Sequence, residues 1–274
     1  MELFSYTFMQ NAIMGVILVS IASAIIGTYI VTRRMVFISG GITHACFGGL
    51  GLGYYLGISP ILTAAFFAVG SALGVEWLTQ KKKVREDSAI GVVWGLGMAI
   101  GTIFIFMTPG YVPELNSFLF GSILTIAYPD LIAFAVYTAV LVAAFGLFFR
   151  IIVACGFDPD FARTLRLPVK LVNGMMTVLV AICIVLTIRM IGIMLLMSLF
   201  TIPQIIAEIY FSQYRKIMAT SVVVCVLSGL TGLFVAFVLD VPVSATIVLV
   251  LVAVYALARF HKMLLEKSRR PAKQ

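Results

Sequence analysis

Long hydrophobic stretches recur along the whole chain, and short polar segments separate them. Read together with the residues that break helices, they predict nine candidate membrane spans. These cover approximately residues 11–32, 36–57, 60–79, 88–107, 127–150, 171–190, 192–210, 217–239 and 242–260. A helix of about 20 apolar residues can cross the roughly 30 Å hydrocarbon layer of a bilayer. The pattern therefore predicts an all-α, polytopic membrane protein of eight or nine transmembrane helices, with one transmembrane domain over residues 1–274.

Composition supports this fold class. Of the 274 residues, 62% are hydrophobic and 11% are charged, whereas an ordinary soluble domain has about 45–50% apolar and about 25% charged residues. The polar segments between spans are too short for a separate soluble domain. The four cysteines have no CxxC spacing and most lie within predicted spans, which argues against a disulfide framework or a zinc knuckle.

The positive charge is unevenly distributed along the chain. The net charge of +8 comes from clusters in the segments between spans, and with nine spans only Arg189 of the 19 Lys and Arg residues falls on the second membrane face. The positive-inside rule then predicts an outside N-terminus and a basic cytoplasmic tail over 261–274. The basic residues are therefore explained by the orientation of the chain in a lipid bilayer, and they do not indicate nucleic-acid binding. If 171–190 and 192–210 were one bent span, later basic clusters would face opposite sides, so two spans are predicted.

The polar segment "CGFDPDFARTLRLPVK", residues 155–170, predicts a short amphipathic helix on the cytoplasmic side. Asp158 can cap a helix that begins at Pro159, and Pro168 is expected to stop it. Phe161 and Leu165 are apolar anchors, and Arg163 supplies charge. Such a helix could lie at the membrane interface or dock on a soluble partner.

A second short segment, Glu114–Leu124, is apolar but too short to cross the membrane. It follows the turn residues Pro109, Gly110 and Pro113. We expect it to be half-inserted or interfacial on the outer side.

Several catalytic motifs are absent. The sequence has no GxxxxGK[ST] phosphate loop, no GxSxG elbow and no HExxH helix, so it lacks the usual means of hydrolysing a nucleotide or a peptide. Of the two histidines, His261 lies in the basic tail and is expected to be solvated. By elimination, the chain is predicted to be a transport protein and not an enzyme.

His44 is an ionisable residue inside the second predicted span. It stands in the stretch "SGGITHACFGG", where Gly40, Gly41, Gly48 and Gly49 crowd around it. Ionisable residues within a membrane are costly and often functional, yet a neutral histidine bonded to a carbonyl is an alternative. The glycines could line a narrow passage or a dimer axis, or they could simply let helices pack closely, as could the spaced pairs Gly91/Gly95 and Gly97/Gly101.

In seven segments the chain resembles the membrane permease subunits of ABC importers for divalent transition metals. The similar segments, in chain order, are "FMQNAIMGVILVSIASAIIGTYIVTRRM", "FISGGITHACFGGLGLGYYLG", "EDSAIGVVWGLGMAIG", "LNSFLFGSIL", "FDPDFARTLRLP", "IGIMLLMSLFTIPQIIA" and "GLFVAFVLDVPVSATIVL". They cover nearly the whole chain in the family's order, and they do not distinguish zinc, manganese and ferrous iron.

The resemblance implies partners and a fold. Two copies of the permease would form the pathway as a homodimer in the cytoplasmic membrane of a bacterium, fed by an extracytoplasmic metal-binding protein. A separate ATP-binding ABC subunit would dock on the segment that contains Asp158, Phe161, Ala162, Arg163 and Leu165. The fold would be similar to the compact permeases of cobalamin and siderophore importers. The divalent metal ion would be the substrate, with no permanently bound cofactor.

The resemblance also implies site residues. His44 matches the family's motif histidine, but Gly40 stands where the family usually has an aspartate four residues earlier, so an i, i+4 ligand pair is lost. Cys46 is a further candidate, although it would point to a different side of the helix.

Other acidic candidates follow from position alone. Glu76, near the inner end of the third predicted span, is a candidate for the metal pathway, and Asp240 could gate metal entry or cap the final helix. Glu86 and Asp87, which open the fourth span, could line an exit path or balance the charge at the start of a helix.

Three alternatives remain open from the residues alone. A permease for an iron chelate or cobalamin would need a wider passage than the glycine-rich span suggests. An ion-coupled secondary transporter would need carboxylates in the middle of its spans, and there are almost none. A structural or signalling membrane protein would not need the docking segment.

Overall fold

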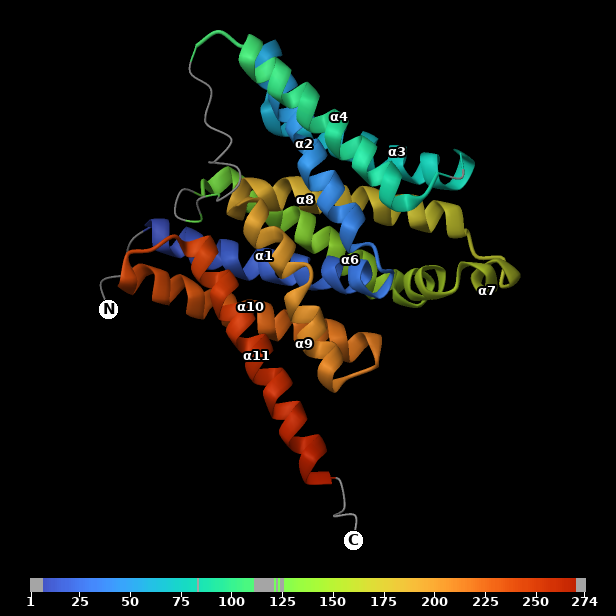
Figure 1. Ribbon diagram of the computed structural model, residues 1–274, viewed down its shortest axis with the longest axis vertical. Coiled ribbons are helices and arrows are strands. Elements are labelled where there is room, and N and C mark those ends of the chain that lie inside the picture. The colour runs from blue at the N-terminus through green and yellow to red at the C-terminus, as the bar shows by residue number, and fades with distance from the viewer. Residues whose placement is uncertain (1–6, 83, 111–120, 122, 124–125, 270–274) are drawn as a thin grey trace.

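The computed structural model describes residues 7–82, 84–110, 121, 123 and 126–269, and almost all of them are helical (Figure 1). The helices are α1 (Thr7–Thr32), α2 (Val36–Leu56), α3 (Pro60–Lys82), α4 (Glu86–Met107), α6 (Tyr128–Phe157), α7 (Pro159–Thr164), α8 (Val169–Leu199), α9 (Ile202–Tyr210), α10 (Tyr214–Leu239) and α11 (Val243–Arg269). Within these residues, eight helical segments are long and apolar enough to cross a membrane. The predicted all-α polytopic fold is confirmed. Most of the predicted segment Glu114–Leu124 lies outside the described residues.

The difference between eight and nine spans lies in one segment. Residues 169–210 form a single apolar stretch of 42 residues, whereas the sequence predicts two spans, at 171–190 and 192–210. Helix α8 is interrupted at Gly192, whose backbone has φ 80° and ψ 171°. Only glycine adopts that conformation readily, because a Cβ would clash there.

Contacts with α11 show that the chain reverses at this break. Close to the start of α11, the hydroxyl of Ser244 donates a hydrogen bond to the carbonyl of Ile191 at 3.0 Å. Farther along α11, the hydroxyl of Tyr210 donates to the carbonyl of Ala258 at 3.1 Å. The residues from Gly192 to Tyr210 therefore run back alongside α11, and both predicted limbs exist within one continuous apolar segment.

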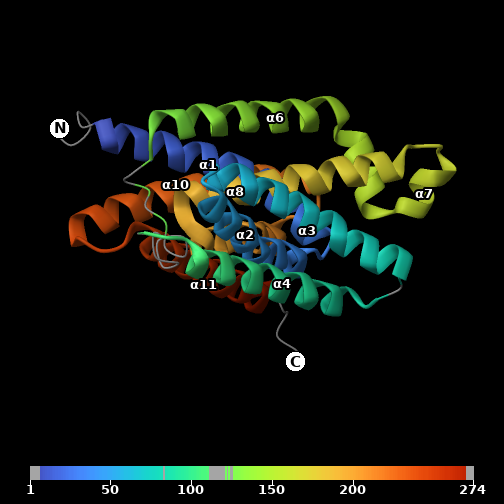
Figure 2. The same cartoon turned by 90° about the horizontal axis from the view of Figure 1, so that it is seen from above.

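The helices form two connected groups. Helices α2, α3 and α4 pack on one another, and α3 and α2 pack against α8. Helix α1 packs against α10, α6 and α8, and contributes many buried residues to the main core. Seen from above, α6 and α4 lie on opposite sides of the molecule, with α1, α8 and α2 between them (Figure 2).

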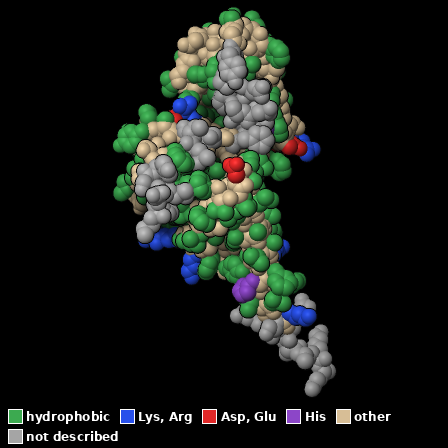
Figure 3. Space-filling model, turned by 90° about the vertical axis from the view of Figure 1, so that its left-hand side faces the viewer, with side chains coloured by type: hydrophobic (Ala, Val, Ile, Leu, Met, Phe, Trp, Pro, Cys, Tyr) green, Lys and Arg blue, Asp and Glu red, His purple; other side chains and the backbone are tan. Residues whose placement is uncertain are grey.

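The bundle has two distinct ends. The α3–α4 and α6–α8 connections lie at one end, together with α7, and we call this the α7 end (Figure 1). At the opposite end, Arg189 forms an ion pair with Asp130, with 2.7 Å between Nε and Oδ1. On the part of the face at that end that is not drawn in grey, hydrophobic and other uncharged side chains predominate (Figure 3).

Candidate functional site

Helix α7 begins as the sequence predicts. A carboxylate oxygen of Asp158 accepts a hydrogen bond from the backbone N–H of Phe161 at 2.9 Å, and Pro159 is the first helical residue. An aspartate cap satisfies a backbone donor that a helix start would leave unpaired. The predicted cap and helix start are confirmed.

The end of α7 differs from the prediction. The helix stops at Thr164, well before Pro168, so the prediction that Pro168 ends it is wrong. Arg166 adopts a left-handed conformation with φ 57°, and the N–H of Leu167 donates to the carbonyl of Ala162 at 3.1 Å. This is a Schellman arrangement, in which a left-handed residue closes the last turn.

The two faces of α7 have different environments. The side chain of Ala162 is fully buried against Cys155 of α6 and Val169 of α8. Phe161 and Leu165 are instead 57% and 55% exposed. Leu165 is the residue directly after α7, and its N–H still donates to the carbonyl of Phe161 at 3.2 Å. The two side chains are therefore one turn apart on the same side, and we call this pair the α7 patch. One face of α7 therefore anchors the loop to the bundle, and the other presents an apolar surface.

A cavity of about 280 Å³ opens between helices near the α7 end. It is lined by residues from α1, α2, α3, α4 and α8 and from the α1–α2 connection: Ile30, Arg33, Met35, Ile38, Ser39, Ile42, Ala72, Val75, Glu76, Thr79, Glu86, Asn173, Thr177 and Val180. Because α8 is far in sequence from the consecutive helices α1–α4, the cavity exists only in the folded bundle.

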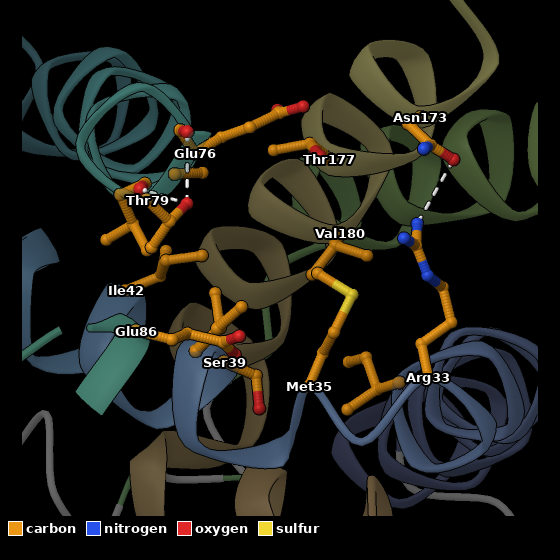
Figure 4. A pocket seen from close by; sticks show the side chains of 14 residues that line it. Arg33, Met35, Ser39, Ile42, Glu76, Thr79, Glu86, Asn173, Thr177 and Val180 are labelled. Atoms are coloured by element: carbon orange, nitrogen blue, oxygen red, sulfur yellow. Dashed lines mark hydrogen bonds between the residues drawn. The ribbon is translucent and has the colours of Figure 1, made fainter. Parts of the chain in front are cut away.

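The polar groups of this cavity are divided between two sides. The side chains of Glu76 and Glu86 reach toward it from α3 and α4 (Figure 4). On the other side, Nη1 of Arg33 donates hydrogen bonds to Oδ1 of Asn173 at 3.1 Å and to the hydroxyl of Tyr29 at 2.7 Å. Carboxylate, hydroxyl and amide oxygens are ligands for hard divalent cations, so the two-glutamate side suits a cation.

His44 lies on α2, partly buried, at the contact with α4. Its imidazole stacks on the indole of Trp94, with ring centroids 4.3 Å apart and planes only 4° apart. No hydrogen bond joins the imidazole to any of the described residues. Trp94 is a neighbour of His44 that was not predicted from the sequence; an aromatic residue between Gly91 and Gly95 in the fourth span was the available signal.

The other predicted pathway residues lie elsewhere. The thiol of Cys46 is buried in the main core and donates to the carbonyl of Ile42 at 3.0 Å. Asp240 is exposed at the opposite end, where it ends α10 in a left-handed conformation. Glu76 lines the cavity at the α7 end. Among the described residues, no three His, Cys, Asp or Glu side chains are grouped so that they could hold one metal ion.

The predicted pathway glycines lie mainly at helix contacts. A Cβ on Gly41 would lie 2.5 Å from Ile90, one on Gly48 would lie 2.5 Å from Phe67, and one on Gly49 would overlap the backbone of α3. Gly40 is partly exposed, and among the described residues only the end of Met197 lies near the position of a Cβ. In this structure three of the four glycines permit close packing and do not border the cavity.

The comparisons with known proteins agree with this architecture. Residues 5–262 match the model of the ABC 3 transport family. An uncharacterised membrane protein of Synechocystis is 37% identical over 253 residues, covering 92% of this chain and 90% of that protein. A probable metal transport system membrane protein of Chlamydia pneumoniae is 35% identical over 238 residues, covering 85% and 81%.

A relative with a named function and a solved structure are also similar to this chain. A manganese transport system membrane protein of Halalkalibacterium halodurans is 29% identical over 260 residues, covering 94% of this chain and 89% of that protein. The structure of PsaBC from Streptococcus pneumoniae in complex with a Fab has a TM-score of 0.83 at 24% identity, covering 94% and 92%. At 24% identity, the similarity to this solved structure shows the fold alone. The chain therefore belongs to the ABC 3 transport family, and it is a multi-pass membrane permease of an ABC transport system, not itself catalytic.

Proposed function

We propose that this chain is the permease of an ABC importer that moves divalent transition-metal ions, namely zinc, manganese or ferrous iron. The observation that carries the proposal is the cavity with Glu76 and Glu86 on one side, because carboxylates bind such cations. The names of the manganese and metal transport relatives support the same substrate class.

The energy would come from another chain. The sequence has no phosphate loop, so a separate ATP-binding subunit would hydrolyse ATP and bind the α7 patch. The α7 end would then face the cytoplasm, with the C-terminus inside, as the basic clusters favour. A binding protein would deliver the ion to the opposite end, where Asp240 lies. Two copies of the chain would complete the pathway as a homodimer in a bacterial cytoplasmic membrane.

Uptake measurements test this function. Cells that express the chain with its ATPase and binding protein should accumulate radiolabelled Mn²⁺, and competition with Zn²⁺ and Fe²⁺ should rank the three ions. Cells that carry an ATPase without nucleotide hydrolysis are the control and should accumulate none. Equal accumulation in the two cell types would contradict the proposal.

Replacing His44 by alanine should weaken uptake at low metal concentration. If the imidazole is a transient ligand, its loss should raise the half-saturating concentration about ten-fold, which corresponds to roughly 1.4 kcal/mol of binding. Cys46→Ala, on the same helix but within the core, is the matched control and should stay close to wild type. If His44→Ala transports normally, the histidine serves helix packing alone.

Replacing Glu76 by glutamine should lower the maximal rate of uptake several-fold, because one cavity carboxylate is lost while the size of the side chain is kept. Asp87→Asn is the control: Asp87 pairs with Arg85 at 3.0 Å, is exposed, and does not line the cavity. Its uptake should be unchanged. An equal loss in both variants would show a general effect of acidic charge at the α7 end and not a role for the cavity.

A further inference from the structure

The stack between His44 and Trp94 is held in place by the backbones of α2 and α4. On α4, a Cβ at Gly97 would lie 2.5 Å from Cα of Ala45, the residue next to His44. A Cβ at Gly101 would overlap the carbonyl of Phe47. Trp94 lies almost one turn before Gly97, so the close approach of the two helices places the indole over the imidazole.

The orientation of the stack leaves the ligating atoms of His44 available. The lone pair with which the unprotonated imidazole nitrogen can bind a metal ion lies in the plane of the ring, whereas Trp94 covers a face of that ring at a 4° interplanar angle. The indole therefore restricts rotation of the imidazole without covering its edge. Phe47, one turn along α2, is nearly parallel at a centroid distance of 6.4 Å. No hydrogen bond from a described residue occupies either ring nitrogen, so orientation depends on these aromatic neighbours.

We propose that Trp94 is a positioning residue for metal transport, which holds the His44 imidazole in one orientation so that a nitrogen can bind a passing divalent transition-metal ion. The inference rests on the proposed function and adds a second side chain to it. A preoriented ligand loses less conformational freedom when the ion arrives, so it binds more tightly than the same ligand on a freely rotating side chain. Preorientation of the imidazole is especially important in this chain, because Gly40 supplies no carboxylate one turn before His44.

Fluorescence can detect metal at this stack directly. The chain has two tryptophans, so the full-length Trp77→Phe variant carries Trp94 as its single indole. Co²⁺ has an open d shell and quenches an indole at short range. Titration of the purified Trp77→Phe chain with Co²⁺ should give saturable quenching, and Zn²⁺ should compete with it. In Trp77→Phe/His44→Gln the saturable quenching should disappear. Quenching that is absent, or equal in the two variants, would overturn the proposal.

Uptake by Trp94 variants tests positioning separately from metal binding. Trp94→Leu should raise the half-saturating metal concentration about two- to ten-fold, the range expected when an aromatic pair is lost, with an unchanged maximal rate. Trp94→Phe keeps an aromatic face and should restore most of the affinity. Equal expression and thermal stability of the two variants exclude a folding defect. If wild type transports metal and Trp94→Leu matches it, the positioning role fails while the proposed function stands; if wild type transports none, the proposed function itself fails.

Discussion

Replacing Phe161 and Leu165 together by aspartate is expected to abolish transport while leaving the permease folded. Both side chains are more than half exposed and contribute little to the core, so the free energy of unfolding should change by no more than about 0.5 kcal/mol for each substitution. Two carboxylates in an apolar docking contact would instead lose solvation without gaining partners. A pull-down with a co-expressed ATP-binding subunit should lose that subunit, and metal uptake should fall to background.

The matched control keeps the α7 patch apolar. Phe161→Leu combined with Leu165→Met should retain both the ATP-binding subunit and most of the uptake, since the size and polarity of the surface change little. Thermal unfolding of both double variants should be close to that of wild type. Retention of the ATP-binding subunit by the aspartate variant would show that the partner binds elsewhere.

The second large effect is expected at the contact between α2 and α4. Adding a methyl group at both Gly97 and Gly101 should destabilise the protein by about 1–3 kcal/mol at each position, because overpacked contacts force helices apart. A Cβ at either site would meet backbone atoms of α2, which cannot move as a flexible side chain can. The Gly97→Ala/Gly101→Ala variant should therefore unfold at a lower temperature in detergent and lose uptake.

The same helix offers a matched control. Gly91 and Gly95 have the same four-residue spacing, but no atom of the described residues lies within 4 Å of the position of a Cβ at either one. Gly91→Ala/Gly95→Ala should therefore leave thermal stability unchanged or slightly higher, because alanine is the better helix former by about 1 kcal/mol in a helix interior. If both double variants lower the thermal stability equally, then added methyl groups destabilise α4 wherever they are placed, and the contact with α2 is not the cause.

The α7 loop shows where local reasoning succeeds and where it stops. The cap by Asp158 and the start at Pro159 could be predicted, because capping involves only neighbouring residues. The end at Thr164 could not. It requires a non-glycine residue, Arg166, in a left-handed conformation, and Leu167 packs there against a small core of Cys155, Ala162 and Val169. Tertiary packing compensates for a backbone conformation that the sequence alone disfavours.

The sequence by itself determined that the chain spans a membrane many times, where most spans begin and end, and where its positive charge lies. These properties are sums over neighbouring residues, and length and hydropathy suffice to predict them. The sequence also predicts that one apolar stretch divides into two spans between residues 190 and 192, and the break at Gly192 agrees with that prediction. Only the tertiary structure decided that Trp94 covers His44, that Cys46 points into the core, and that Glu76 and Glu86 share a cavity. Most of these spans are apolar on every side, so no hydrophobic stripe indicates which face turns inward. Close backbone contacts decide the rotation of each helix instead, and these contacts join residues distant in sequence.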